Sequence, residues 1–468
     1  MLPDDVLLEI FDTYVTETGH EQEWHKLIHV CRRWRRVVFA SPHRLNLRLL
    51  CTYTTPVKKT LRVWPALPIV IWGYDYPRSL VKGAANITAA LEHRSRVCQI
   101  DLRNVPISVL EKLVGAMQEQ FPSLRRLVLE SNHANAPILP ATFLAGSAPC
   151  LESLRLIGIP FLALPNLLMS ATNLVSLGLW GIPHSGYIPP QAMATALSAL
   201  TRLKSLYLKF QSPLSRPDRT NRHLPPLTRV TLPALSTLQF KGISEYFEAL
   251  VAQIDAPQLT NLGIVFFHQL VFDTPQLLRF VCRTNAPNAS IDADLLFCDD
   301  FVRLNLYSLK RKSDRHKILG LVIRCMGSDW QLSSLSQVCR SLSPLLSRVK
   351  HVGLCQDSHG LRPHWHDDME HAQWLELLQW FTGVEDLCLT QELGLLVPSS
   401  LQELAREGVI NVLPALRSIS IDGFGPLGLV EAEVIKKYVA PRQLSGRPVT
   451  LDRWSMTLLV RLKASRGL

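Results

Sequence analysis

The largest group of side chains able to do chemistry lies between Asp357 and His371, where the sequence holds four histidines and three aspartates. Imidazole and carboxylate groups bind transition metals. The spacing of His364 with His366 would suit a strand, and that of Asp367 with His371 a helix. The segment also contains a glycine and a proline, and it has no cysteine ligand or recognised ligand spacing. We therefore interpret it as a hydrated loop between two structural repeats, and we expect no metal and no cofactor.

Sequence motifs for common catalytic sites are absent. The chain contains no G-x-x-x-x-G-K, G-x-S-x-G or H-E-x-x-H pattern. Its acid pairs, Asp299 with Asp300 and Asp367 with Asp368, are adjacent in sequence, and neighbours on a strand point to opposite faces. Acid/base catalysis needs convergent groups, so these pairs give no support for a hydrolase, and we expect a protein that is not an enzyme.

The first elements of the chain form an apolar hairpin. Pro3 suits the first turn of a helix, and Asp4 and Asp5 would interact favourably with the positive end of its dipole. The first helix then carries one apolar stripe made of Val6, Leu7, Ile10, Phe11, Tyr14 and Val15. A second stripe follows a polar turn around Gly19 and is made of Trp24, Leu27, Ile28, Cys31, Trp34 and Val38.

Such a hairpin is too short to bury its own apolar residues. Units of about 40 residues rarely fold alone without a staple or a partner. Arginines occupy the other side of the second stripe, and Ser41-Pro42 ends it. The exposed apolar residues therefore need a partner to cover them, although an ordinary amphipathic hairpin remains the alternative interpretation.

The order of residue types in this hairpin resembles the F-box, the helical module that binds the Skp-type linker subunit of a cullin-RING ubiquitin ligase. The matching residues, over about 43 positions, are Leu2-Pro3, Val6-Leu7, Ile10-Phe11 and the block Val30-Cys31-Arg32-x-Trp34-Arg35. Two features depart from the F-box pattern. Arg44 stands near where many F-boxes have tryptophan. The chain also begins directly at the motif, and from this we expect a preceding segment to be missing. The resemblance implies that the linker subunit is bound by Leu2, Pro3, Val6, Leu7, Ile10, Phe11, Val30, Cys31 and Trp34.

Composition indicates a globular chain. Its 468 residues are 47% apolar, which is compatible with a sizeable core. No window approaches the ~18 uninterrupted apolar residues that a membrane span needs, and the N-terminus is acidic, so we expect a protein of the cytoplasm or nucleus without a membrane partner. The ten cysteines are scattered singly, which favours buried reduced thiols over disulfides or zinc.

The formal charge of +11 would favour acidic partners or nucleic acid. The basic residues are nevertheless spread along the chain, with dense clusters only at Arg216–Arg229 and Lys310–Lys317. Neither cluster has the interleaved aromatic residues that stack on bases. We interpret each as a solvated loop and do not expect nucleic acid as a partner.

A leucine-rich period dominates the rest of the chain. Segments of the form L-x-x-L-x-L begin at Val97, Leu124, Leu151, Leu174, Leu203, Leu235, Leu259, Val349, Val384 and Leu416. The first seven are spaced 23 to 32 residues apart, close to the about 20 to 29 residues of leucine-rich repeats. Only the segment at Leu124 continues to an asparagine in the expected place, Asn132. We therefore expect an irregular solenoid with variable turns.

Each repeat unit should contain one short strand followed by a helix. The second and third apolar residues of L-x-x-L-x-L are two apart and point to the same side of the strand, while the residues between them point outward. Met193–Leu200 and Tyr246–Ile254 are two of the expected helices. The outward residues that we expect to form the surface for a protein cargo are Arg126, Val128, Arg155, Trp180, Tyr207, Lys209, Gln239, Lys241 and Asn261.

Together these patterns predict an α/β protein: a three-helix F-box followed by an irregular leucine-rich-repeat solenoid of parallel strands and helices. We place the F-box at 1–45, a connecting segment at 46–95, the solenoid at 96–430 with two or three degenerate repeats in 265–348, and a C-terminal cap at 431–468. The expected function is a substrate-recognition adaptor of an SCF-type ubiquitin ligase, bound through the Skp-type linker to a cullin. A non-catalytic interaction scaffold without a role in ubiquitination is the alternative.

Overall fold

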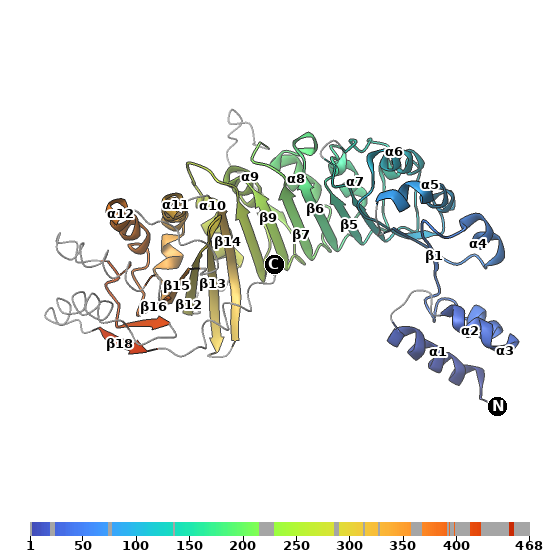
Figure 1. The fold of residues 1–468 in the computed structure, drawn as a ribbon, viewed down its shortest axis with the longest axis horizontal. Helices are drawn as coiled ribbons and strands as arrows, with labels where there is room; N and C mark the ends of the chain where they lie inside the picture. The colour runs from blue at the N-terminus through green and yellow to red at the C-terminus, as the bar shows by residue number, and fades with distance from the viewer. Residues whose placement is uncertain are drawn as a thin grey trace. The chain divides into compact units, whose positions relative to one another are not determined.

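The computed structural model describes residues 2–18, 24–73, 77–133, 136–214, 229–284, 290–311, 314–325, 328–356, 367–390, 393, 397, 412–422 and 449–453. The chain divides into two compact units, Met1–Gln211 and Ser212–Leu468. In each unit, short strands alternate with helices along the sequence, and the sheets are mostly parallel (Figure 1). The predicted α/β class is therefore confirmed.

The first unit begins with three helices: α1 (Asp4–Thr18), α2 (Trp24–Val30) and α3 (Arg32–Ala40). The apolar stripe from Trp24 to Val38 is broken at Cys31, which has an extended backbone (φ −157°, ψ 170°). The Sγ atom of Cys31 accepts a hydrogen bond from the backbone N–H of Trp34 at 3.4 Å. Cys31 is therefore the N-cap of α3, and the stripe is divided between two helices.

One apolar side of each helix forms a small core. Leu7 and Phe11 of α1 are buried together with Ile28 and Val38, and the rings of Phe11 and Trp34 lie 4.7 Å apart. This core continues into the connecting segment, because the buried Trp24 packs edge-on against Trp64 at 5.7 Å. The Trp24 Nε1–H also donates to the carbonyl of Arg48. These contacts join the hairpin to the residues that follow it.

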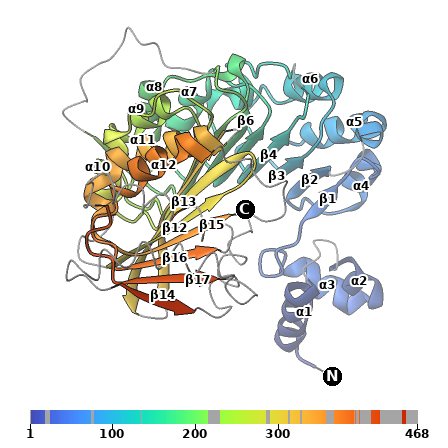
Figure 2. The ribbon, with the colours of Figure 1, turned by 60° about the vertical axis from the view of Figure 1, so that its left-hand side comes forward.

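The sheet of the first unit contains seven parallel strands in sequence order. They are β1 (Leu49–Cys51), β2 (Ile69–Gly73), β3 (Val97–Leu102), β4 (Arg126–Glu130), β5 (Ser153–Ile157), β6 (Ser176–Ile182) and β7 (Ser205–Phe210). The helical elements between them are α4 (Val57–Val63), α5 (Pro77–Leu91), α6 (Ile107–Ala116), η1 (Phe143–Gly146), α7 (Leu164–Ser170), η2 (His184–Gly186) and α8 (Pro190–Leu197). Helices α5 to α8 cover one face of this sheet, and none of the described helices of these repeats covers its other face, which we call the helix-free face (Figures 1 and 2).

Two columns of buried apolar side chains run across these strands on the helix-covered face. One column is Ile100, Leu127, Leu154, Leu177 and Leu206, each paired in register with the next. The second column lies two residues further along each strand and contains Leu102, Leu129, Leu156, Leu179 and Leu208. The predicted alternation of inward and outward residues is thus present on β4 to β7, with two exceptions, since Val128 and Gly178 are also buried.

The second unit contains a further parallel series with one different segment. Its strands are β8 (Val230–Thr231), β9 (Thr237–Gly242), β10 (Ile254–Asp255), β11 (Asn261–Phe266), β12 (Ser290–Phe297), β13 (Phe301–Arg311), β14 (Asp314–Arg324), β15 (Val349–Gln356), β16 (Asp386–Thr390), β17 (Ser418–Asp422) and β18 (Thr450–Arg453). Its helices are α9 (Ser244–Val251), α10 (Pro275–Thr284), α11 (Ser328–Leu346) and α12 (Asp367–Leu378). All ten L-x-x-L-x-L segments of the chain coincide with a strand.

The different segment lies where we expected two or three degenerate repeats. Strand β13 runs antiparallel to β12 and to β14, and the order in the sheet is β9-β11-β14-β13-β12-β15. The chain therefore enters β12, turns back along β13 and returns along β14, so that β14 pairs with β11 and β12 pairs with β15. Three long strands joined by short turns can pair in this way without crossover helices, which is why no repeat period appears there.

Other expectations from the sequence were met only in part. The helices predicted at Met193–Leu200 and Tyr246–Ile254 begin two or three residues earlier, as α8 and α9. Cys51, Cys325, Cys339 and Cys355 are buried free thiols, and burial raises the pKa of Cys51 to about 11, but Cys31, Cys150 and Cys282 are exposed. Of the expected cap at 431–468, the structure describes only 449–453, which include β18. None of the helices in the described ranges is long and apolar enough to cross a membrane.

Helix α10 begins at a buried carboxylate. The Glu248 side chain of α9 accepts hydrogen bonds from the backbone N–H groups of Gln276 at 2.6 Å and Leu277 at 2.8 Å. These N–H groups have no partner inside their own helix, so Glu248 caps α10 from a neighbouring helix. Burial is nevertheless the larger effect and raises the pKa of Glu248 to about 7.

This raised pKa predicts that stability falls as pH rises between about 4.5 and 7. In that interval the folded protein holds a proton on Glu248 that the unfolded chain has lost, so raising the pH favours unfolding by up to about 3 kcal/mol. Urea unfolding of the wild type and Glu248→Gln at several pH values should show this slope in the wild type alone. Glu111→Gln, at an exposed position of α6, should keep the wild-type slope; equal slopes in Glu248→Gln and wild type would contradict the assignment.

Candidate functional sites

The first candidate site is an exposed apolar face on the helical hairpin. Leu2 is 52% exposed, Val6 41%, Ile10 47% and Val30 59%, and Pro3 and Cys31 are also exposed. Leu2, Val6 and Ile10 are spaced four residues apart, so they follow one side of α1 and its N-terminal extension. Of the nine predicted linker-binding residues, Leu7 and Phe11 are instead buried in the hairpin core, and Trp34 is half-buried against Phe11.

Arg33 holds the start of α1 next to the start of α3. Its guanidinium forms an ion pair with Asp4 at 2.7 Å and donates a hydrogen bond to the carbonyl of Leu2. Val30 and Cys31, which directly precede α3, are thereby brought to the same end of the hairpin as Leu2. Arg44, at the position where many F-boxes have tryptophan, forms an ion pair with Glu9 of α1.

The second candidate site lies on the helix-free face of the first unit. Four of the predicted cargo-binding residues, Arg155, Trp180, Tyr207 and Lys209, meet there. The guanidinium carbon of Arg155 lies 5.6 Å from the centre of the Trp180 ring, and the Nζ atom of Lys209 lies 4.2 Å from the same centre. The centres of the Trp180 and Tyr207 rings are 5.6 Å apart. Cations are attracted to the negative face of an indole. We call these four residues the cation–indole cluster.

Arg126 is not part of this cluster. Its guanidinium lies 3.7 Å from the carboxylate of Asp101, which is buried and also accepts two hydrogen bonds from Arg103, at 2.9 and 3.2 Å. The charge of Arg126 is therefore already partly compensated within the protein. A surface arginine in an ion pair offers less to a partner, because binding would have to compete with the existing carboxylate.

The predicted cargo residues of the second unit form a separate and more polar group. The side-chain amide of Gln239 donates to Asn261 at 3.4 Å and lies over Gly263, where any side chain would collide with it. The Nζ atom of Lys241 lies 5.3 Å from the centre of the Phe267 ring. These contacts organise the side chains along β9 and β11.

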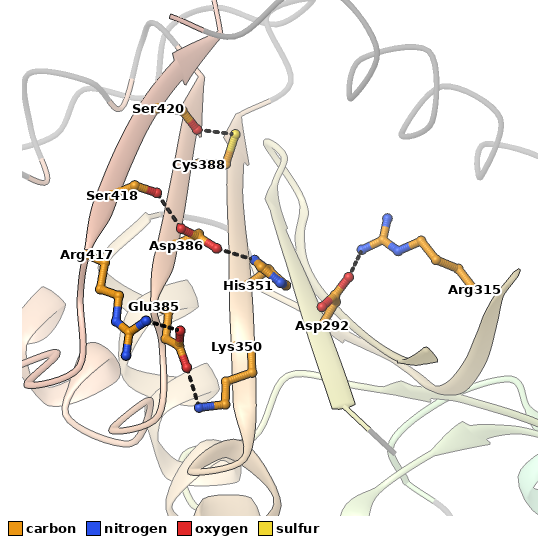
Figure 3. Close-up of polar contacts among 10 residues, drawn as sticks. All are labelled: Asp292, Arg315, Lys350, His351, Glu385, Asp386, Cys388, Arg417, Ser418 and Ser420. Carbon is orange, nitrogen blue, oxygen red and sulfur yellow. Dashed lines mark hydrogen bonds and ion pairs between the residues drawn. The ribbon is translucent and has the colours of Figure 1, made fainter. Parts of the chain in front are cut away.

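A polar network that the sequence analysis missed crosses strands β12 to β17. The carboxylate of Asp386 lies between His351 and Ser418, contacting the His351 Nδ1 atom at 2.6 Å and accepting a hydrogen bond from Ser418 (Figure 3). Asp292 pairs in register with His351, and Arg315 lies 3.4 Å from both Asp292 and Asp294. The guanidinium of Arg315 also lies over the ring of Tyr307 at 4.4 Å.

Asp292 and Asp294 are buried, and burial raises the pKa of each, while Arg315 opposes the rise. The signal that could have revealed them is the run Ile291 to Phe297, which carries two aspartates two residues apart inside an apolar strand. Charged residues in such a strand need a countercharge when they are buried. The sequence does not show that Arg315 provides this countercharge. Arg315 belongs to the basic cluster Lys310–Lys317, which the sequence analysis predicts to be a solvated loop.

That interpretation of Lys310–Lys317 was wrong. Lys310 and Arg311 end β13, and residues 314–317 begin β14. Arg315 forms its two ion pairs there, and burial lowers the pKa of Lys317. Of the other basic cluster, the structure describes only Arg229, whose Nε–H donates to the carbonyl of Ala252.

The network does not have the arrangement of a nucleophilic triad. A Ser-His-Asp triad requires the histidine between the hydroxyl and the carboxylate, whereas here Asp386 is the middle residue (Figure 3). The predicted loop at Asp357–His371 lies outside the described residues up to 366, and the side chains of 367–371 are not described either. Among the side chains that the structure describes, no group of three or more His, Cys, Asp or Glu residues could hold a metal ion.

Comparison with known proteins adds no assignment: no protein-family model matches the chain, and no curated protein matches its sequence.

The Arg315 network leads to a prediction about stability. Replacing Arg315 by methionine leaves two buried carboxylates without their countercharge, so we expect the free energy of unfolding at pH 7 to fall by about 3 kcal/mol. The loss should shrink as the pH falls towards 4, because protonation removes the uncompensated charges.

Urea unfolding at pH 7 and pH 4 measures this effect. The triple variant Arg315→Met/Asp292→Asn/Asp294→Asn should recover much of the stability at pH 7. Arg324→Met, at an exposed position at the end of β14, removes a cation from outside the network and is the matched control. A loss at pH 4 as large as that at pH 7 would show that packing and not charge explains the role of Arg315.

Proposed function

We propose that the chain is a substrate-recognition adaptor of an SCF-type cullin-RING ubiquitin ligase, with the hairpin as an F-box and the sheet as a leucine-rich-repeat surface for cargo. The observation that carries the proposal is the exposed apolar face of the hairpin, Leu2, Val6, Ile10 and Val30, at residues that match the F-box order. Exposed apolar residues that cluster on one side mark interaction sites. The Skp-type linker subunit is the partner that this resemblance indicates.

The two ends of the chain have different tasks in this proposal. The linker subunit would cover the apolar face of α1 and the start of α3, and through it the chain would join a cullin. The outward residues of the sheet would bind cargo and hold it near the loaded ubiquitin carrier, which raises the local concentration of the acceptor lysine. Other subunits would perform ubiquitin transfer.

The division of the nine F-box residues into exposed and buried sets sharpens this proposal. Leu2, Val6, Ile10 and Val30 would contact the linker directly, whereas Leu7 and Phe11 would support the face from the hairpin core. Variants of the exposed set should therefore lose binding without losing the fold. Variants of the buried set would destabilise the hairpin itself.

The test is capture of the purified linker subunit by the full chain. Burying one valine or isoleucine contributes about 1.5 to 3 kcal/mol, so Val6→Asp and Ile10→Asp should each weaken binding by about tenfold or more. Leu162→Asp, at an equally exposed apolar position outside the hairpin, should bind as the wild type does. Isothermal titration calorimetry gives the affinities, and thermal melting confirms that each variant is folded.

Two outcomes would contradict this function. One is that the wild-type chain fails to bind the linker subunit at micromolar concentration. The other is that the Ile10→Asp variant binds the linker subunit as tightly as the wild type does.

The alternative is an interaction scaffold without a role in ubiquitination, which the cation–indole cluster on the sheet would serve equally well. The two functions predict different fates for a bound protein. An adaptor should lower the level of its partner in cells, and proteasome inhibition or Ile10→Asp should restore that level. A scaffold should leave the level unchanged under both conditions while the partner is still captured.

A further inference from the structure

Trp180 occupies a space that Gly178 leaves open. A Cβ atom built at Gly178 would lie 2.9 Å from the Nε1 atom and 3.3 Å from the Cδ1 atom of the Trp180 side chain. Real Cβ atoms essentially never lie within 3.0 Å of such an atom, so a side chain at position 178 would require the indole to shift. The indole thus folds back over its own strand, β6, on the helix-free face.

The neighbouring strands place a residue on each side of that indole. Gly178 pairs in register with Arg155 of β5 and with Tyr207 of β7. Because Gly178 has no side chain, the Trp180 ring lies near both neighbours, and Lys209, the register partner of Trp180, lies over the ring at 4.2 Å. The indole is therefore held by three side chains from two other strands.

The two cations of this cluster have no anionic partner among the described residues. In the part of the chain that the structure describes, Arg155 and Lys209 form no ion pair with a carboxylate, in contrast to Arg103 and Arg126, which share Asp101. Two positive charges directed at one ring repel each other, and burial lowers the pKa of Lys209. An anion placed between them would remove the repulsion and form charge-assisted hydrogen bonds with both.

We propose that the cation–indole cluster binds an acidic segment of a partner protein. A carboxylate of that segment is held between the Arg155 guanidinium and the Lys209 ammonium, and the adjoining carbon chain packs against Trp180 and Tyr207. This inference rests on the proposed function only in naming the segment as cargo. The binding itself does not depend on the linker subunit.

The observations favour an acidic protein segment over a nucleic acid. The cluster has two cations at one indole, whereas proteins that bind single strands use a groove of cations that follows the backbone and several aromatic rings for successive bases. Tyrosine, tryptophan and arginine are also the residues most enriched in protein hot spots.

The experiment is a fluorescence titration of the full chain with N-acetylated hexaglutamate, with hexaglutamine and the oligonucleotide dT20 as comparison probes. Because the chain has ten tryptophans, the signal of Trp180 is taken as the difference between the wild type and Trp180→Phe. We expect hexaglutamate to change this signal and to bind at least tenfold more tightly than either comparison probe. Binding should weaken as salt rises.

Substitutions in the cluster test separately the charges of the two cations and the position of the Trp180 indole. Arg155→Met and Lys209→Met should each weaken hexaglutamate binding about tenfold or more, since each loses a charge-assisted hydrogen bond. Gly178→Ala should weaken binding and change the Trp180 emission even without peptide, because the new methyl group displaces the indole. Arg202→Met removes a cation that contacts Asn173 outside the cluster and should bind as the wild type does.

Several results would overturn the proposal: hexaglutamine or dT20 binding as tightly as hexaglutamate, or Arg155→Met and Lys209→Met both binding hexaglutamate as the wild type does. The Ile10→Asp variant distinguishes a failure of this proposal from a failure of the proposed function. It should bind hexaglutamate normally while it fails to capture the linker subunit. Loss of linker capture alone counts against the adaptor function, and loss of peptide binding alone counts against the acidic segment.

Discussion

The in-register stacking of apolar side chains between parallel strands is the constraint on which the rest of this structure depends. Each strand from β3 to β7 contributes a pair of residues to the two buried columns, such as Leu154 and Leu156, which lie beside the equivalent pair of the next strand. Because side chains alternate across a strand, the residue between the two must point to the opposite face. The columns of leucines on one face therefore decide which residues are displayed in rows on the other.

Contacts between outward side chains form where a glycine interrupts a row of outward residues. Gly178 leaves room for the Trp180 indole, Gly263 for the Gln239 amide and Gly320 for the Lys317 side chain. At each glycine, a neighbouring long side chain lies along the sheet instead of standing away from it. This is how one repetitive backbone produces a cation–indole cluster in one unit and an amide pair in the other.

The helical hairpin and the β12–β14 segment depart from this regular stacking in different ways. In the hairpin, one set of apolar residues forms a core and another remains exposed, so its stability and its proposed binding are carried by different residues of the same motif. In the β12–β14 segment, the antiparallel strand β13 brings charged residues between two parallel stretches. Asp292 and Asp294 are tolerated in that interior because Arg315, from the returning strand β14, lies against both.

The amino-acid sequence by itself determined where ten of the strands lie and which of their residues form the buried columns. All ten L-x-x-L-x-L segments are strands, because a pattern of alternating apolar residues can be buried on only one face. It also indicated the start of α1 and the stripes of the hairpin, but not the break at Cys31, where a local cap overrides a continuous stripe. Nor did it separate Leu7 and Phe11, which are buried, from Val6 and Ile10, which are exposed.

Only the tertiary structure decided which outward residues meet. The turns between strands vary in length, so register cannot be counted along the chain, and the meeting of Arg155, Trp180, Tyr207 and Lys209 follows from strand pairing. The same holds for Arg315, which lies in an apparently solvated basic run until β13 and β14 pair and bring it to Asp292 and Asp294. Contacts between residues distant in sequence depend on the long-range packing of the whole unit, and that packing has no local signal.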